Sequence, residues 1–299
     1  MAPLRLTKPR VIAIFGPTGS GKSAVAEAIA ARIPAELVSA DSMQVYRGLP
    51  LLTNQPALPT HLVAIWNLGH EASVGEYQRL AHAAIDEILE LGRTPVVVGG
   101  TGLYLRAALA ELELPPPPAG GERERWERIY DRLGPEGAHA LLGERDAATA
   151  EAVHPNDRRR VVRALELAEA GYSLRPSRDR LWAGETRRPT VVFGLDIPRA
   201  ELARRIEDRT RALFERGVEE EVRRALSGSL STTAGQVLGL REVAELPREE
   251  AITRVALRTR QYAAYQRRWM RRLPGVVIVR ADRPPGEIAD EIVEMARAR

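Results

Sequence analysis

The chain of 299 residues contains no cysteine. It therefore cannot form disulfides, thiolate zinc sites or cysteine-ligated iron–sulfur clusters, and it has no cysteine nucleophile. Its five histidines are scattered along the chain without the spacing of an HExxH metal site. We expect each of them to lie at the surface or in a cap rather than to bind a metal; they are His61, His70, His82, His139 and His154.

Long apolar runs are also missing. The longest apolar stretches, such as residues 11–15 and 96–98, fall far short of the roughly 20 residues that a membrane helix needs. The N-terminus lacks the apolar segment of about 7–15 residues that marks a signal peptide. With 44% hydrophobic and 28% charged residues, the chain can bury a large core. We therefore expect a cytoplasmic protein with no membrane partner.

Lysine is nearly absent from a chain with 44 lysines and arginines and a net charge of +4. Lys8 and Lys22 are its two lysines. Arginine binds phosphate through two parallel hydrogen bonds and stacks on bases, so this composition suits a nucleic-acid partner. A coding bias toward arginine explains the general trend equally well. It does not explain why one of the two lysines lies at position 22, inside a phosphate-binding motif.

That motif is the sequence GPTGSGKS, which fits the pattern GxxxxGK[ST]. An apolar segment at 11–15, typical of a buried strand, precedes it, and a helical pattern at 23–33 follows it. In such a loop the backbone N–H groups and the helix N-terminus surround a phosphate chain, Lys22 adds a cation, and the Ser23 hydroxyl binds Mg²⁺. We therefore predict a phosphate site with Mg²⁺, formed by Gly16, Pro17, Thr18, Gly19, Ser20, Gly21, Lys22 and Ser23.

Strand-like and helical segments alternate around this loop. All-apolar strands that alternate with helices predict an α/β fold, a P-loop NTPase-like parallel sheet with helices on both faces. The expected strands are 11–15, 36–40, 95–98, 190–195 and 274–279, and the expected helices are 23–33, 76–91, 200–216, 218–227 and 248–272.

The pattern breaks at Pro115–Pro118 and the following Ala-Gly-Gly, which indicates a stiff linker. Charged helical segments follow, and a polar connector at 171–189 ends them. We therefore expect an inserted helical domain at 114–187 within a core formed by 1–113 and 188–299. Its expected helices are 122–133, 137–142, 147–153 and 157–170.

Asp41 follows the second expected strand. The carboxyl ends of strands in open α/β sheets line the binding crevice, so Asp41 should face the phosphate loop. There its carboxylate can accept a proton or hold a metal, or it can merely cap a turn. The strand at 96–98 runs into Gly99-Gly100-Thr101-Gly102 instead of the acidic Mg²⁺ ligand usual in P-loop ATPases. The loop therefore suits a diphosphate bound for a purpose other than hydrolysis.

Each of three further features allows a functional and a purely structural interpretation. Gln44 can read an adenine edge with two hydrogen bonds, or it is a surface glutamine. Thr101 can donate to a phosphate oxygen, or its loop is only a structural turn. The arginines of Asp157–Arg163 can contact an RNA backbone, or they form a solvated helix face.

Taken together, the motifs resemble the bacterial tRNA dimethylallyltransferase family, also called tRNA isopentenyltransferases or IPP transferases. The resemblance covers most of the chain, and its motifs follow in family order. They are GPTGSGKS (16–23), DSMQVYRGL (41–49), VVVGGTGLYLRAAL (96–109), HPNDRRRVVRALE (154–166), RIEDRTRALFERGVEEEV (205–222) and RTRQYAAYQRRW (258–269). The chain departs from the family pattern at 51–56, at 238–240 and at 264–265.

The resemblance implies a P-loop core whose helical insertion clasps the anticodon stem-loop of tRNA. It implies transfer of a dimethylallyl group from dimethylallyl diphosphate to N6 of adenosine 37, in tRNAs reading codons that begin with U, by a monomer that uses Mg²⁺. The alternatives are a P-loop kinase of a nucleoside or other small molecule and an RNA-binding NTP switch without chemistry.

The resemblance also implies roles for single residues. Asp41 would be the general base, and Thr101 and Arg209 would act with the phosphate loop on the diphosphate. The implied tRNA contacts are Asp41, Ser42, Met43, Gln44, Thr101, Arg123, Asp157, Arg158, Arg159, Arg160, Val161, Gly235, Gln236, Val237, Leu238, Gly239 and Leu240.

Overall fold

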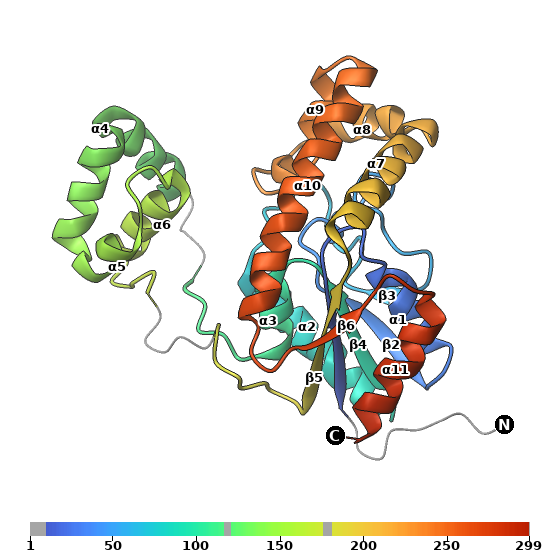
Figure 1. Cartoon of the computed structure of the whole chain (residues 1–299). Coiled ribbons are helices and arrows are strands. Elements are labelled where there is room, and N and C mark those ends of the chain that lie inside the picture. The colour runs from blue at the N-terminus through green and yellow to red at the C-terminus, as the bar shows by residue number, and fades with distance from the viewer. Residues whose placement is uncertain (1–9, 117–120, 176–180, 299) are drawn as a thin grey trace. The chain divides into compact units, whose positions relative to one another are not determined.

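The computed structural model describes residues 10–116, 121–175 and 181–298, which divide into two compact units (Figure 1). One unit comprises the described residues up to Glu111 and from Leu181 onward, and the other those between Leu112 and Arg180. Both boundaries differ from the expected insertion at 114–187: Leu112 and Glu113 belong with the second unit, and residues 181–187 belong with the first. Buried Arg106 holds them there by donating to the carbonyls of Leu181 and Ala183 at 2.8 and 2.9 Å.

The first unit is built on a six-stranded parallel sheet, as far as the described residues show, with strand order β3-β2-β4-β1-β5-β6. Its strands are β1 (Val11–Phe15), β2 (Ala35–Ser39), β3 (Thr60–His61), β4 (Thr94–Gly99), β5 (Thr190–Asp196) and β6 (Val277–Arg280). The central strand β1 is buried over its whole length, which explains its unbroken apolar sequence.

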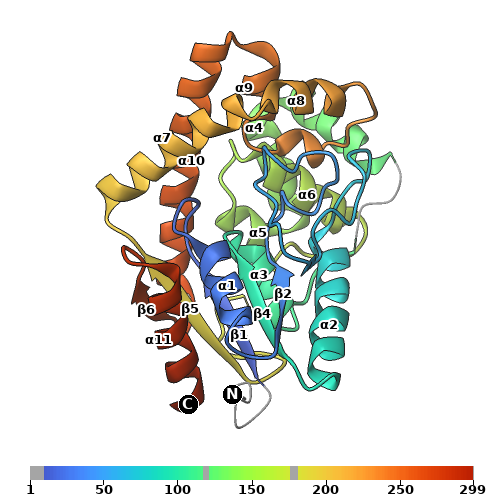
Figure 2. The same cartoon turned by 90° about the vertical axis from the view of Figure 1, so that its right-hand side faces the viewer.

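Helices cover both faces of this sheet (Figures 1 and 2). On one face, Ile12 and Ile14 of β1 pack in one apolar cluster with α1 (Lys22–Ala30) and α11 (Pro285–Ala298). Side chains alternate along a strand, so Ala13 and Phe15 face the other side. That side is covered by α2 (Val74–Glu90) and α3 (Gly102–Leu109). The predicted α/β class with helices on both faces is confirmed.

A group of helices rises beyond the carboxyl ends of the strands (Figures 1 and 2). They are α7 (Arg199–Glu215), α8 (Val218–Leu226), the 3₁₀ turn η1 (Ala234–Gln236), α9 (Leu240–Glu245) and α10 (Arg248–Arg272). Long α10 packs along α7 and also reaches α3 beside the sheet. Segments far apart in the sequence thus meet above the phosphate loop.

The second unit is helical, as predicted for the insertion. It consists of α4 (Glu122–Arg145), α5 (Ala147–Ala152) and α6 (Arg158–Glu169). Two helices, as expected at 122–133 and 137–142, share the label α4: the backbone of Gly134 between them is not helical (φ 73°, ψ 171°), and Pro135 follows. These helices enclose an apolar core of their own around Trp126, Leu142 and Leu165.

Several elements were not predicted, namely α3, α9, α11 and β3. Helix α3 was missed because the glycines at 99–102 resemble a turn. In the structure Gly102 begins the helix, and a Cβ there would lie 2.1 Å from the Trp269 ring. The expected linker residues 117–120 and part of the connector, 176–180, lie outside the described residues. Among the described helices, none has the length and apolar character that spanning a membrane requires.

Candidate active site

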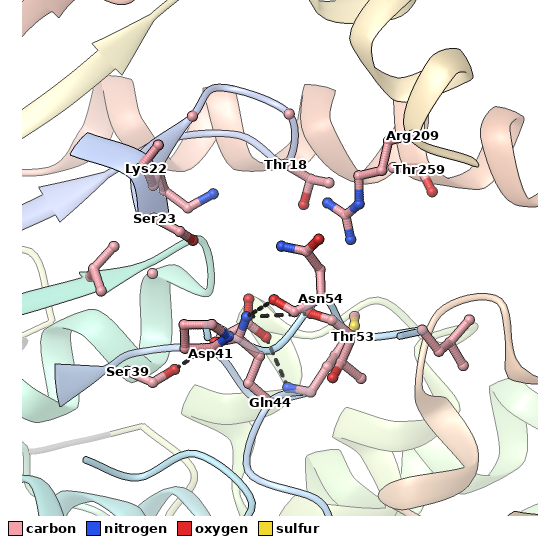
Figure 3. Close-up of a pocket in the computed structure, with 18 of the residues that line it drawn as sticks. Thr18, Lys22, Ser23, Ser39, Asp41, Gln44, Thr53, Asn54, Arg209 and Thr259 are labelled. Atoms are coloured by element: carbon pink, nitrogen blue, oxygen red, sulfur yellow. Dashed lines mark hydrogen bonds between the residues drawn. The ribbon is translucent and has the colours of Figure 1, made fainter. Parts of the chain in front are cut away.

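A cavity of about 420 Å³ lies at the carboxyl edge of the sheet, between the phosphate loop, α7 and α10 (Figure 3). It combines residues from several stretches of the first unit, some of them far apart in the sequence. The lining residues include Thr18, Gly19, Gly21, Lys22, Ser23, Asp41, Met43, Gln44, Leu52, Thr53, Asn54, Arg205, Ile206, Arg209, Leu213, Leu238, Val255, Thr259 and Tyr262.

The phosphate loop supplies one wall of this cavity. Gly19 and Gly21 have φ values of 88° and 87°, a left-handed backbone that favours glycine. The Nζ of Lys22 donates to the Pro17 carbonyl at 3.1 Å. The buried Ser20 hydroxyl has no hydrogen-bond partner within the described residues. Of the eight predicted loop residues, Gly16, Pro17 and Ser20 do not line the cavity and the other five do.

Three cations line this cavity: Lys22, Arg209 and Arg205, of which Arg205 pairs with Glu201 at 2.7 Å. Burial lowers the pKa of Lys22 to about 8, an effect that nearby Arg209 reinforces and Asp41 opposes. Burial likewise lowers the pKa of Arg209, again against the opposing effect of Asp41. In the part of the chain that the structure describes, no acidic side chain forms an ion pair with Lys22 or Arg209. The site therefore holds positive charge that an incoming anion would compensate.

Asp41 lies across the cavity from the phosphate loop, and both functions proposed for it are compatible with its position. One carboxylate oxygen accepts from the Met43 amide at 2.9 Å and so caps the turn. The next residue is held by Thr101, whose hydroxyl accepts from the Ser42 amide at 3.2 Å. The Thr101 hydroxyl also lies 3.3 Å from that of Tyr262. Thr101 itself does not line the cavity, so it supports the Asp41–Ser42 segment from behind.

Gln44 lines the cavity, but its side-chain amide is already engaged (Figure 3). The Ser39 hydroxyl donates to its Oε1 at 2.9 Å. Its Nε2 donates to the carbonyls of Asn54 and Thr53 at 2.8 and 3.3 Å. These hydrogen bonds compete with the predicted recognition of an adenine edge, and they fix the loop that carries Asn54.

Sequence reasoning missed the contribution of α10. The buried amide of Gln266 accepts from the Thr18 amide at 2.8 Å and donates to the Gly100 carbonyl at 2.9 Å. A Cβ at Gly100 would lie 2.2 Å from Nε2 of Gln266, which explains the glycine. Thr259 and Tyr262 line the cavity from the same helix. The signal was present, because Thr259, Tyr262 and Gln266 are spaced for one helical face.

The predicted tRNA contacts in the second unit differ in whether their side chains already have partners within the unit. Arg123 forms an ion pair at 2.8 Å with Glu166, whose side chain is 1% exposed. Asp157 caps α6 by accepting from the Arg160 amide at 3.2 Å. The side chain of Val161 is buried in the core of the unit. These three residues therefore have structural roles.

The arginines of the predicted RNA-binding run lie at the start of α6. Arg158 pairs with Asp131 at 2.9 Å, and Arg160 pairs with Asp157 at 3.4 Å. Arg159 is exposed, and no acidic partner for it occurs among the residues that the structure describes. Arg159 is thus the arginine of the three that is available to a phosphate without breaking an ion pair.

Of the predicted stretch 235–240, Leu238 lines the cavity. Val237 and Leu240 are buried, and Gly239 has a left-handed φ of 93°. A Cβ at Gly239 would lie 3.0 Å from Leu52, another residue of the cavity wall. This stretch therefore shapes the apolar end of the cavity, while Gly235 and Gln236 in η1 lie outside it.

Comparison with known proteins agrees with this geometry. The chain matches the family model for IPP transferase over residues 44–273 and that for isopentenyl transferase over residues 9–58. The chain belongs to the IPP transferase family. The tRNA dimethylallyltransferases of Streptomyces coelicolor and Corynebacterium jeikeium are 40% and 36% identical to it over 281 and 291 residues. These alignments cover 90% and 93% of this chain and 89% and 94% of the relatives.

Solved structures of IPP transferases share the fold. The full-length tRNA isopentenylpyrophosphate transferase from Bacillus halodurans superposes with a TM-score of 0.68 and 31% identity, covering 97% of this chain and 98% of that one. A eukaryotic dimethylallyltransferase acting on tRNA superposes with a TM-score of 0.70 and 25% identity, covering 92% of this chain and 74% of that one. The resemblance and the P-loop NTPase-like fold are confirmed, and the kinase alternative is not favoured.

Proposed function

We propose that this member of the IPP transferase family is a tRNA dimethylallyltransferase. In this proposal it transfers a dimethylallyl group from dimethylallyl diphosphate to N6 of adenosine 37, in tRNAs reading codons that begin with U. One observation carries the proposal: the carboxylate of Asp41 and the cations Lys22 and Arg209 line the same cavity. The names of the relatives support the same class of enzyme and the tRNA substrate.

The transfer reaction needs both a carboxylate and cations. The adenine amine is a weak nucleophile because its lone pair is delocalised into the ring. In the reaction the N6–C1 bond forms, the C1–O bond to the diphosphate breaks, and N6 gives up a proton. Asp41 accepts that proton as general base. Lys22 and Arg209 stabilise the negative charge that grows on the departing diphosphate.

The site also suits Mg²⁺, which we propose as cofactor. The Ser23 hydroxyl lines the cavity next to Lys22, and hydroxyl and phosphate oxygens are the hard ligands that Mg²⁺ prefers. Ser23 would hold the ion by its hydroxyl, with the remaining ligands coming from diphosphate oxygens and water. When bound, the ion would neutralise part of the diphosphate charge.

We propose that the second unit contacts the anticodon stem-loop, with exposed Arg159 meeting a phosphate. Adenosine 37 must leave its stack to reach the buried cavity, as in other enzymes that modify bases. We further infer a cytoplasmic monomer, because tRNA is a cytoplasmic substrate and the family resemblance implies a single chain.

The test is incubation of the purified protein with Mg²⁺, dimethylallyl diphosphate and an unmodified tRNA that reads UNN codons, followed by nucleoside mass spectrometry. We expect adenosine 37 to gain the mass of one dimethylallyl group, and no gain when ATP replaces the donor. Bound tRNA without a mass gain would contradict the proposal. Measurement of ATP turnover would then decide between a kinase and a nucleotide switch.

A further inference from the structure

Several hydrogen bonds hold the loop at 49–55, which contributes Leu52, Thr53 and Asn54 to the cavity wall. The buried carboxylate of Glu221 accepts from the amides of Leu51 and Leu52, both at 2.8 Å. Gln55 Nε2 donates to the Tyr46 carbonyl at 2.8 Å. Together with the hydrogen bond from Gln44 to the Asn54 carbonyl, these contacts fix the backbone on both sides of Asn54.

Asn54 occupies a backbone position that few residues adopt. Its φ is 52°, in the left-handed region that disfavours side chains other than those of asparagine and aspartate. Its amide lines the cavity and points toward Thr18 and Arg209 (Figure 3). Among the described residues, the side-chain amide of Asn54 has no hydrogen-bond partner. The loop thus presents a free amide toward the phosphate-binding side of the cavity.

We propose that the Asn54 side-chain amide donates a hydrogen bond to the diphosphate of the prenyl donor. It would thereby position the leaving group between the phosphate loop and Arg209. A neutral donor suits this place, because Lys22 and Arg209 are both buried and their positive charges already repel each other. The other cation of the wall, Arg205, is paired with Glu201. A further cation without such a partner would add like-charge repulsion in the cavity, whereas an amide strengthens anion binding without it. The assignment rests on the proposed function only in naming the diphosphate as the group bound.

The test is the affinity of inorganic pyrophosphate, measured with Mg²⁺ by calorimetry. The variant Asn54→Gly removes the amide and keeps the left-handed backbone at no steric cost. The variant Asn54→Asp keeps the shape but replaces the donor with a negative charge. Hydrogen bonds to charged groups are strong enough that Asn54→Gly should lose affinity about tenfold. Asn54→Asp should lose more.

Ala64 provides a matched control, because it has the same φ of 52° and does not line the cavity. Ala64→Gly should leave pyrophosphate affinity within about twofold of the wild type. Three results would overturn the proposal. One is an unchanged affinity in Asn54→Gly, another is a loss confined to tRNA affinity, and the third is an equal loss in Ala64→Gly. Dimethylallyl transfer by the wild-type protein tests the proposed function separately, since pyrophosphate binding does not require turnover.

Discussion

At the scale of single residues, the two carboxylate oxygens of Asp41 have different roles: one is structural and the other is available for chemistry. The Met43 amide donates a hydrogen bond to Oδ1 of Asp41. Within the described residues Oδ2 has no hydrogen-bond partner, so this oxygen is free to take a proton. The turn that fixes Asp41 therefore also orients it, and it needs no further movement to face the cavity. This arrangement matches what a general base requires, namely a fixed carboxylate with one oxygen available.

Replacement of Asp41 by asparagine tests this role directly. The variant keeps an oxygen that can accept from the Met43 amide but cannot accept the N6 proton. We expect turnover to fall by about 10²–10⁴-fold, the usual contribution of a general base, with tRNA affinity nearly unchanged. Single-turnover transfer and filter binding measure the two quantities. A variant within threefold of the wild-type rate would exclude Asp41 as the base.

Lys22 makes a pH-dependent prediction. In the free protein its pKa is lowered to about 8, so Lys22 loses its proton as the pH rises through that value. A bound diphosphate favours the protonated form. Pyrophosphate affinity should therefore fall as the pH rises above about 8, by up to tenfold per pH unit. Binding to Lys22→Met, in which only the titration of pyrophosphate itself remains, is the control. Equal pH profiles for both proteins would contradict the lowered pKa.

At the scale of elements, α10 links the phosphate loop to the end of β4 through Gln266. Gln266→Leu leaves the Thr18 amide and the Gly100 carbonyl without this partner. Each unpaired buried group should cost about 1–3 kcal/mol in the free energy of unfolding, and pyrophosphate affinity should fall as the loop loosens. Urea denaturation and calorimetry measure the two effects. Gln261→Leu, at an exposed position of the same helix, should change neither.

The elements also show what the sequence could and could not reveal. The phosphate loop was predictable because its backbone, its lysine and its hydroxyl lie within eight consecutive residues. Asp41 could be assigned to the same crevice because strand ends in a parallel sheet share one edge. Asn54 could not, since its role depends on contacts with residues far away in the sequence. For Gln266 the helical spacing predicts a face shared with Thr259 and Tyr262, but not the partners of its amide. Helix α3 was missed because only the packing of Trp269 explains why a glycine begins it.

At the scale of the whole molecule, each unit has its own apolar core. Separate cores predict unfolding that is not two-state. Arg123→Ala weakens the second unit, because buried Glu166 loses its 2.8 Å partner. Gln266→Leu weakens the first. In scanning calorimetry we expect two transitions, with each variant lowering a different one. A single transition that both variants shift equally would show that the chain unfolds as one unit.

The net charge of +4 and the exposed arginines make tRNA binding salt-dependent. Removal of a phosphate contact reduces the slope of log affinity against log salt by about one. We expect this change for Arg159→Ala, which breaks no ion pair in the described structure. Arg128→Ala, at an exposed arginine on α4 of the same unit, serves as the control and should keep the wild-type slope. Equal slopes for Arg159→Ala and the wild type would remove Arg159 from the RNA interface.

The chain leaves the first unit and returns to it at one helix, α3. The Arg187 amide donates to the Leu109 carbonyl at 2.7 Å, and Arg106 holds the returning segment at Leu181 and Ala183. The two ends of the insertion therefore lie beside the same helix, and a short turn between them would complete the first unit without the inserted residues. In evolutionary terms, a helical unit that is attached at one helix can be gained, exchanged or lost without rebuilding the strand ends that carry the phosphate loop.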